Sequence, residues 1–303
     1  MLWDRQMKIG YVGLGVMGGA LARRLQSSRD LRVYDLNPDA VAGLVGAGAS
    51  AADSPASLAR DCDVVMLCLP TSAHVREAIF GERGLAEGLK AGAIVVDQTS
   101  GDPNETRRMA VELAGRSIEM VDAPVSGGAA GAKAGTIAIM VGGGEAQLAS
   151  VRPILADISP NVFHCGGIGA GQVMKLINNM VSSTIRMVTL EGVAMGVRNG
   201  IDLQTMTDVL NSGGARSRVS ENLLPAVIRG RPDSFFLLSL MLKDLNLATQ
   251  LGVDSGVPLH YGHLTRAMLQ TASNTFGPDA NYYEVTRLVA MQAGVEFPAP
   301  DSA

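Results

Sequence analysis

Short apolar runs alternate with amphipathic stretches up to about residue 166 and then cease. Such alternation of strand and helix patterns favours a mostly parallel sheet with helices on both faces. The predicted strands are 8–12, 31–34, 64–69, 93–97, 119–122, 136–141 and 162–165, with helices among them at 17–26, 38–45 and 103–114. The chain is therefore expected to begin with an α/β domain.

A different pattern follows this domain. From Gln172 to Arg198 the chain contains no proline and is rich in apolar residues. This predicts one helix, at about 170–198, that exceeds the usual length for a globular protein and is buried by two domains. The remaining residues are helical in pattern. We therefore predict an α/β domain over residues 1–166 and an all-α domain over residues 167–303 that includes the long interdomain helix.

Composition excludes several classes of protein. The net charge is −4 and Lys and Arg form no dense run, so a nucleic-acid partner is not expected. No apolar run approaches the roughly 20 residues of a membrane span, and no signal peptide stands at the start. Three cysteines without metal-ligand spacing, Cys62, Cys68 and Cys165, are expected as free thiols in a reducing compartment. We predict a cytoplasmic protein without membrane partners.

A glycine-rich fingerprint lies between the first predicted strand and helix. The sequence GLGVMG fits G-x-G-x-x-G and consists of Gly13, Leu14, Gly15, Val16, Met17 and Gly18. The first glycine permits a tight turn, the second lets backbone approach a pyrophosphate, and the third allows close packing of helix on strand. A glycine-rich turn without a ligand is the alternative. Its position between strand and helix favours a Rossmann-type dinucleotide-binding domain.

The choice of cofactor depends on Asp35, which ends the next predicted strand. A carboxylate there accepts hydrogen bonds from ribose hydroxyls and repels the 2′-phosphate of NADP. No Arg follows within 36–38 to hold such a phosphate. The sequence therefore predicts NAD in preference to NADP. A helix N-cap is the alternative role for Asp35, and the loops at 69–70 and 97–100 either line the cofactor crevice or serve only as connections.

Five segments, in this order, resemble the β-hydroxyacid dehydrogenase family (3-hydroxyisobutyrate dehydrogenase-like). They are GLGVMG at 13–18, CLP at 68–70, DAPVSGGAAGAKAGT at 122–136, GAGQVMKLINN at 169–179 and LMLKDLNLA at 240–248. The chain departs from the family pattern D-x-S-T-x-x-P at 97–103, where the two hydroxyl residues are exchanged as Thr99-Ser100. Both hydroxyls remain available for a contact with the nicotinamide end.

The resemblance implies hydride transfer between NAD and the alcohol or carbonyl group of a small 3-hydroxy acid, with Lys175 as general acid–base. It also implies a homodimer or homotetramer formed through the all-α domain. The substrate is expected on Ser126, Gly127, Gly128, Asn179, Phe236 and Asp244. Besides the fingerprint and Asp35, the cofactor is expected on Leu69, Pro70, His74, Ser100 and Lys243.

The residues themselves support this chemistry. Lys175 and Asn179 are four apart on a predicted helix and share a face among apolar neighbours. Desolvation would lower the pKa of the lysine toward the working pH, as an acid–base group requires. Adjacent Gly127 and Gly128 let backbone N–H groups converge on a carboxylate. A snorkelling surface lysine and a flexible loop are the alternatives. The four histidines form no ligand set, so no metal is expected.

Two other functions compete with this hypothesis. Imine reductases share the scaffold and the GLGxMG string, but they generally lack a lysine at the position of Lys175. A non-catalytic dehydrogenase-like interaction module would also lose this lysine or add domains. The sequence leaves the particular 3-hydroxy acid open. Arg216 and Arg218 either bind a second anionic group of the substrate or face solvent.

Overall fold

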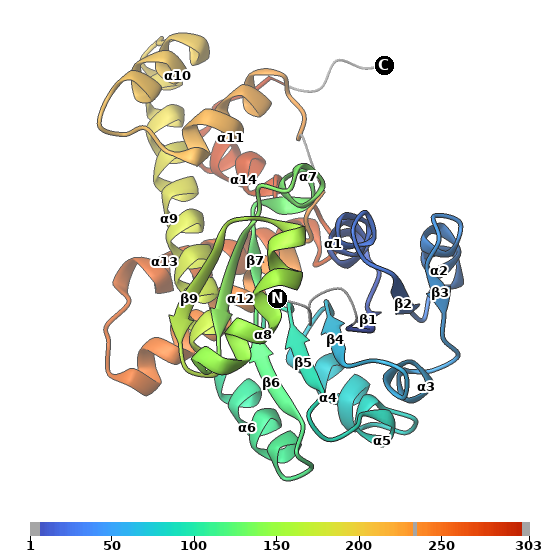
Figure 1. Ribbon diagram of the computed structural model, residues 1–303. Helices are drawn as coiled ribbons and strands as arrows, with labels where there is room; N and C mark the ends of the chain where they lie inside the picture. Colours follow the sequence, from blue (N-terminus) through green and yellow to red (C-terminus); the bar gives the residue numbers. More distant parts are fainter. Residues whose placement is uncertain (1–6, 233–234, 299–303) are drawn as a thin grey trace. The chain divides into compact units, whose positions relative to one another are not determined.

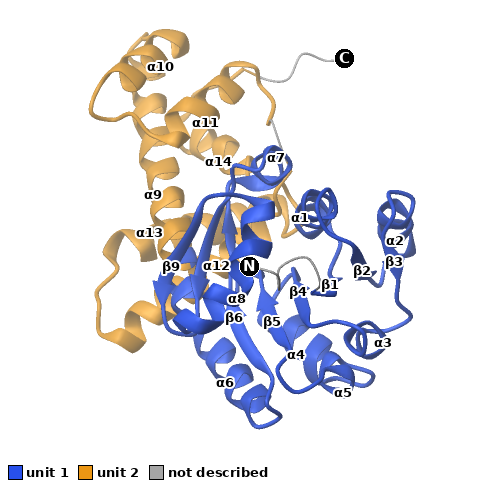
Figure 2. Ribbon diagram, viewed as in Figure 1, with its two compact units in different colours: residues 1–175 blue, residues 176–303 orange. Residues whose placement is uncertain are grey.

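The computed structural model describes residues 7–232 and 235–298. The chain divides into two compact units, residues 1–175 and 176–303, coloured separately in Figure 2. The long helix α9 (Ala170–Arg198) begins in the first unit and continues into the second. The boundary between the units therefore falls inside an unbroken helix.

The first unit is built on a nine-stranded sheet (Figure 1). Its first six strands lie in the order β3-β2-β1-β4-β5-β6 and pair in parallel, which is the Rossmann arrangement. β8 pairs antiparallel with β6 and β7 and parallel with β9. The strands are β1 (Ile9–Val12), β2 (Leu31–Tyr34), β3 (Ser50–Ala51), β4 (Val64–Leu67), β5 (Ile94–Asp97), β6 (Glu119–Asp122), β7 (Val125–Ser126), β8 (Ala138–Gly142) and β9 (Val162–Gly166).

Helices cover both faces of this sheet. In β4, Val64 and Met66 belong to one apolar cluster and Val65 and Leu67 to the other, because successive strand residues point to opposite faces. Helices α1 (Val16–Gln26), α2 (Pro38–Val45), α7 (Gly128–Ala134) and α8 (Glu145–Ile158) contribute to the first cluster. Helices α3 (Pro55–Ala59), α4 (Ser72–Phe80), α5 (Leu85–Gly88) and α6 (Pro103–Ala114) contribute to the second.

The sequence predicted the longer strands and differed from the structure mainly at their ends. β4 stops at Leu67, two residues earlier than predicted, because the N–H of Leu69 donates to the Thr99 hydroxyl at 3.0 Å instead of continuing the ladder. The two-residue strands β3 and β7 were not predicted. They are too short to show a period in the sequence, and only their partners identify them.

The second unit is helical. Besides the continuation of α9 it contains α10 (Leu203–Ser212), α11 (Arg218–Ile228), α12 (Leu238–Ser255), α13 (His260–Phe276) and α14 (Glu284–Ala293). Its core is one apolar cluster in which Leu190, Leu245 and Leu269 are fully buried. Outside the named strands, the described part of the chain shows a single isolated bridge, between Leu237 and Asn281. The expected all-α architecture is confirmed.

The prediction that the long helix, α9, is buried by two domains needs correction for one stripe of its surface. Val181, Val188 and Met195, spaced seven residues apart, are 47%, 60% and 67% exposed. The core of the second unit covers a different side of the helix, which includes Leu190 and Ala194. In residues 7–232 and 235–298, neither α9 nor any other helix combines the length and apolar character that crossing a bilayer demands.

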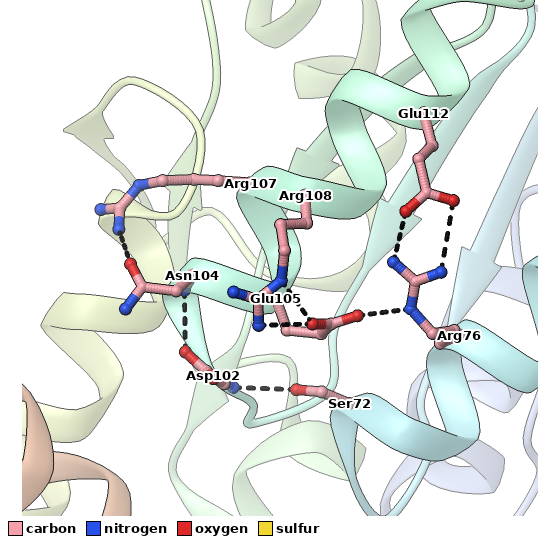
Figure 3. Close-up of polar contacts among 8 residues, drawn as sticks. All are labelled: Ser72, Arg76, Asp102, Asn104, Glu105, Arg107, Arg108 and Glu112. Carbon is pink, nitrogen blue, oxygen red and sulfur yellow. Dashed lines mark hydrogen bonds and ion pairs between the residues drawn. The ribbon is translucent and has the colours of Figure 1, made fainter.

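An ion-pair network joins the helices that follow β4 and β5, α4 and α6 (Figure 3). Arg76 on α4 lies 2.5 Å from a carboxylate oxygen of Glu105 and 2.5 Å from one of Glu112, both on α6. At the start of these helices, the Asp102 N–H donates to the Ser72 hydroxyl at 2.8 Å. The two helices are therefore tied at both ends of their contact, which restrains the loops that precede them.

Replacing Arg76 by Met removes the charge but keeps most of the side chain. We expect Arg76→Met to lower the free energy of unfolding near neutral pH by about 1 kcal/mol or less, because the ion pairs are partly exposed. Hydrogen bonding to Arg76 holds the pKa of Glu105 below its usual value. This contribution is therefore present above the unfolded pKa of about 4.3 and is lost as pH falls through the folded pKa. Urea unfolding of the wild-type protein and of Arg76→Met over a pH series measures the difference in their free energies of unfolding. A difference that stayed constant down to about pH 3 would contradict the prediction.

Candidate active site

The three fingerprint glycines meet different steric demands. Gly13 has a φ of +90°, and a Cβ there would run into the carbonyl of Cys68 and lie 2.8 Å from Leu69 Cδ2. A Cβ on Gly18 would collide with the carbonyl of Gly13. Gly15 is the N-cap of α1, with no side-chain cap and no atom within 4 Å of where its Cβ would lie. The open space at an uncapped helix N-terminus fits the pyrophosphate of a dinucleotide.

Asp35 follows β2 and braces the glycine turn. Its carboxylate accepts hydrogen bonds from the N–H of Leu14 at 2.5 Å and from the N–H of Asn37 at 2.7 Å. The N-cap of α2 is Asn37, so the alternative role of Asp35 as a helix cap does not hold. A carboxylate has about four acceptor positions, so two backbone bonds leave capacity for the ribose hydroxyls.

The loops after β4 and β5 are joined directly. Thr99 is buried, and its hydroxyl accepts the Leu69 N–H while its own N–H donates to Asp97 Oδ1 at 2.9 Å. Ser100 is half-buried and Pro70 is exposed. The exchange of the two hydroxyl residues thus has a structural meaning: Thr99 holds the two loops together, and Ser100 is the more accessible hydroxyl.

His74 lies in the first turn of α4 and is exposed. Its Nδ1 lies 2.7 Å from the hydroxyl of Thr71, the N-cap of α4. The imidazole is therefore oriented by the cap of its own helix while remaining accessible to a ligand.

The segment predicted to bind the substrate carboxylate connects β7 to α7. Ser126 ends β7 and is half-buried, and Gly127 and Gly128 are exposed, with φ values of +140° and +69°. No atom lies within 4 Å of the position of a Cβ on Gly128. Residues that carry a side chain rarely adopt these backbone φ values, so the tight turn depends on the two glycines.

The start of α9 is held by Asp122, to which the sequence assigned no role. This carboxylate ends β6, is fully buried, and accepts the N–H of Gly169 at 2.6 Å and of Gln172 at 2.7 Å. Burial raises the pKa of Asp122, against the opposing effect of these backbone bonds. Helix N-termini need acceptors for their first N–H groups, and the glycine-rich segment before α9 offers no side-chain cap. That lack is the signal that could have indicated a remote acceptor.

Gln172 is the second functional candidate that the sequence did not single out. It is fully buried, its Nε2 donates to the carbonyl of Thr99 at 2.8 Å, and its Oε1 accepts the N–H of Gly101 at 2.8 Å. Lys175 follows one turn later on α9 and is 9% exposed. The alternative of a snorkelling surface lysine is disfavoured by this burial.

A polar cluster occupies the second unit. Asn179 donates from Nδ2 to Asp244 Oδ2 at 2.6 Å, and Lys243 Nζ lies 3.1 Å from Asp244 Oδ1. Asn179 and Asp244 are 6% and 2% exposed, and the Lys243 side chain is 22% exposed. The structure thus brings together three residues predicted for the site. Phe236 is more exposed, at 38%, and its ring packs edge-on against Tyr282.

Burial raises the pKa of Cys68 to about 12 and that of Cys62 to about 11, so both remain thiols at neutral pH. Among the described residues, His, Cys, Asp and Glu do not gather in threes that could hold a metal ion. Arg216 and Arg218 are exposed, and Arg216 pairs with Glu221 at 2.7 Å, which favours the solvent-facing alternative.

Two family models together match most of the chain. Residues 8–167 match the NAD binding domain of 6-phosphogluconate dehydrogenase. Residues 169–289 match a model described as NAD-binding of NADP-dependent 3-hydroxyisobutyrate dehydrogenase.

Individual proteins are similar over most of the chain. 3-Hydroxyisobutyrate dehydrogenase of Pseudomonas aeruginosa is 38% identical over 248 residues, covering 79% of this chain and 83% of its own. An NAD-dependent L-serine dehydrogenase of the same organism is 36% identical over 269 residues, covering 86% and 90%. The crystal structure of a 3-hydroxyisobutyrate dehydrogenase from Salmonella typhimurium superposes with a TM-score of 0.84 at 29% identity, covering 93% of this chain and 100% of that one.

The fingerprint glycines allow a paired test. Gly15→Ala should fold with a loss of no more than about 1 kcal/mol, because its Cβ meets open space. NADH binding should weaken by about tenfold or more, since the methyl group fills the space that the backbone offers to a pyrophosphate. Gly18→Ala should instead lose about 1–3 kcal/mol of stability, because its Cβ meets backbone that cannot move aside. Thermal unfolding and NADH titration distinguish the two. Unchanged NADH affinity in Gly15→Ala would contradict the assignment.

Proposed function

Since the chain belongs to the β-hydroxyacid dehydrogenase family, we propose that it is an NAD-dependent dehydrogenase of a small 3-hydroxy acid with Lys175 as general acid–base. The observation that carries the proposal is the burial of Lys175 on α9, one turn after a side chain bonded to the Ser100 loop. A buried amine one helical turn from a side chain that is bonded to the predicted nicotinamide-contacting loop is suited to proton transfer.

Most residues assigned to the cofactor follow the carboxyl ends of parallel strands, and one, Lys243, lies on α12 of the helical unit. In this proposal the pyrophosphate lies on 13–18, the adenosine ribose on Asp35, and the remaining contacts come from Leu69, Pro70, His74, Ser100 and Lys243. The nicotinamide, when bound, supplies the hydride acceptor for alcohol oxidation. The open N-cap at Gly15 and the spare acceptor capacity of Asp35 support this assignment.

Lys175 performs the proton transfer. Its amine takes the proton from the substrate hydroxyl during oxidation and returns it during reduction. Ser126, Gly127 and Gly128 bind the substrate carboxylate in a turn whose two positive φ values depend on the glycines. Asn179, Asp244 and Phe236 are assigned to the rest of the substrate, with the hydrogen bond between Asn179 and Asp244 fixing the amide.

The substrate class follows from the carboxylate site and from the relatives. The similar proteins are named for 3-hydroxyisobutyrate, L-serine and 2-(hydroxymethyl)glutarate, all acids with a hydroxyl on the third carbon. We infer that this chain oxidises a compound of the same type, working as a homodimer or homotetramer formed through the helical unit. The exposed apolar residues Val181, Val188 and Met195 on α9 support such an assembly.

Cofactor choice is a separate prediction, because the similar proteins include both NAD-dependent and NADP-dependent enzymes by name. Asp35, with no Arg in 36–38, should favour NAD over NADP by at least ~tenfold in kcat/KM, about 1.4 kcal/mol. Replacing Asp35 by Asn should reduce this preference, because the repulsion of the 2′-phosphate is removed. Steady-state kinetics with each cofactor and one good substrate measure it, and an NADP preference in the wild-type enzyme would refute the assignment.

The catalytic role of Lys175 predicts that its removal damages turnover more than binding. Lys175→Ala should lower kcat by ~10²–10⁴, the usual contribution of positioned proton transfer. Lys175→Arg should fail almost as badly, because a guanidinium keeps its proton at any working pH. The affinity for NADH should change little, since the pyrophosphate and ribose contacts are assigned to 13–18 and Asp35.

Steady-state kinetics on a panel of 3-hydroxy acids, NADH titration and circular dichroism on both variants provide the measurement. Lys133, an exposed lysine on α7, supplies a matched control: Lys133→Ala should leave kcat unchanged. A folded Lys175→Ala enzyme that kept more than about a tenth of wild-type kcat would have lost under ~1.4 kcal/mol of transition-state stabilisation. Lys175 would then be structural, and Lys243 would be the next residue to test.

A further inference from the structure

The side-chain amide of Gln172 brackets one residue of the loop after β5. It donates to the carbonyl of Thr99 and accepts from the N–H of Gly101, each at 2.8 Å. Ser100 lies between these two backbone groups. The amide therefore pairs with the loop as a neighbouring strand would, and it supplies hydrogen-bond partners to two backbone groups of buried residues.

The same glutamine belongs to the helix that carries Lys175. The two residues are three apart on α9, so they occupy neighbouring positions on one helix face. A shift of the first turn of α9 relative to the loop would break both bonds of the amide. The position of Lys175 relative to Ser100 is thus coupled to the side chain of Gln172.

The helix has little freedom to shift in other directions. The N–H of Gln172 donates to Asp122, and so does that of Gly169. A Cβ on Gly171 would lie 2.8 Å from Asp122 Oδ2 and 3.0 Å from the N of Gly142, which shows how closely α9 approaches the ends of β6 and β8. Gln172 consequently joins three elements through its backbone and side chain together.

We propose that Gln172 is a positioning residue: it sets the separation between the Ser100 loop, where the nicotinamide is expected, and the proton-transferring amine of Lys175. This inference rests on the proposed function. Proton and hydride leave neighbouring atoms of one alcohol, so the groups that receive them must keep a defined distance. A misplacement of about 1 Å can cost about 10²-fold in rate.

A purely structural glutamine would predict a different result. Loss of its hydrogen bonds would then lower stability, while the folded enzyme would keep its turnover. A positioning role predicts that kcat falls in the folded protein while binding is retained, because the adenosine half of the cofactor is assigned to 13–18 and Asp35. Comparing the change in kcat with the change in KM therefore distinguishes the structural role from the positioning role.

The test uses Gln172→Met, which preserves length and volume but removes both hydrogen bonds. The matched control is Gln26→Met on α1, because Gln26 Nε2 also donates to a backbone carbonyl, that of Leu44, at 3.1 Å. We expect kcat of Gln172→Met to fall by about 10–100-fold, with KM for substrate and Kd for NADH changed by no more than about threefold. Hydrogen exchange at the Gly101 amide should accelerate in Gln172→Met alone, whatever the activity.

A second variant, Gln172→Glu, tests the proposal if Gln172→Met folds poorly. In Gln172→Glu the introduced carboxyl can bond both Thr99 and Gly101 only when protonated, and burial raises its pKa. Its kcat relative to wild type should therefore rise as pH falls from about 9 to about 6. An ionised carboxylate acting only through the charge of Lys175 would give the opposite trend, because it would stabilise the ammonium form.

The outcomes separate this inference from the proposed function. A wild-type enzyme inactive on every 3-hydroxy acid would overturn the proposed function, and the Gly101 exchange rate would still show whether the bracket exists. An active wild type beside a folded Gln172→Met enzyme with more than about half its kcat would overturn the positioning role alone. A change in Gln172→Met that is confined to KM would also overturn the positioning role. The same holds if the kcat of Gln172→Glu, relative to wild type, stays constant or falls as the pH is lowered.

Discussion

The buried carboxylate of Asp122 is the interaction on which the candidate site depends. It accepts hydrogen bonds from the backbone N–H groups of Gly169 and Gln172. The same carboxylate therefore lies at the end of β6 and caps the N-terminus of α9. A buried carboxylate is costly unless hydrogen bonds compensate it, and an uncapped helix N-terminus supplies such donors together with a favourable dipole. The N–H groups compensate the buried carboxylate, and the carboxylate caps the helix. The first turn of α9 is thereby anchored to the sheet.

The remaining polar contacts of the first unit extend this anchor outward. Gln172 reaches the loop after β5, Thr99 reaches the loop after β4, and the helices that follow are joined by Arg76 and its two glutamates. In each contact, a side chain of one segment bonds to a neighbouring loop or helix and so restrains its position. A site assembled from loops gains accuracy when each loop is held by its neighbour, because hydride and proton transfer tolerate little displacement.

The same arrangement accounts for the chemistry we assign to Lys175. Proton transfer by an amine is efficient only where the position of the amine is fixed. The Rossmann sheet places an open helix N-terminus at Gly15, where we propose the phosphates bind, and an acidic residue, Asp35, that braces the glycine turn. In the helical unit, the buried Asn179 and Asp244 are hydrogen-bonded to each other, and Lys243 pairs with Asp244.

The sequence by itself determined the order of strands and helices, the glycine turn with Asp35, and the candidate lysine, because periodicity and local motifs are properties of neighbouring residues. It could not predict the short strands β3 and β7, whose existence depends on their partners, nor the exposed stripe along α9. Only the tertiary structure showed that Asp122 caps α9 and that Gln172 brackets Ser100. These bonds join residues 50 and 71–73 positions apart, and no local pattern specifies which distant backbone group a buried polar side chain will meet.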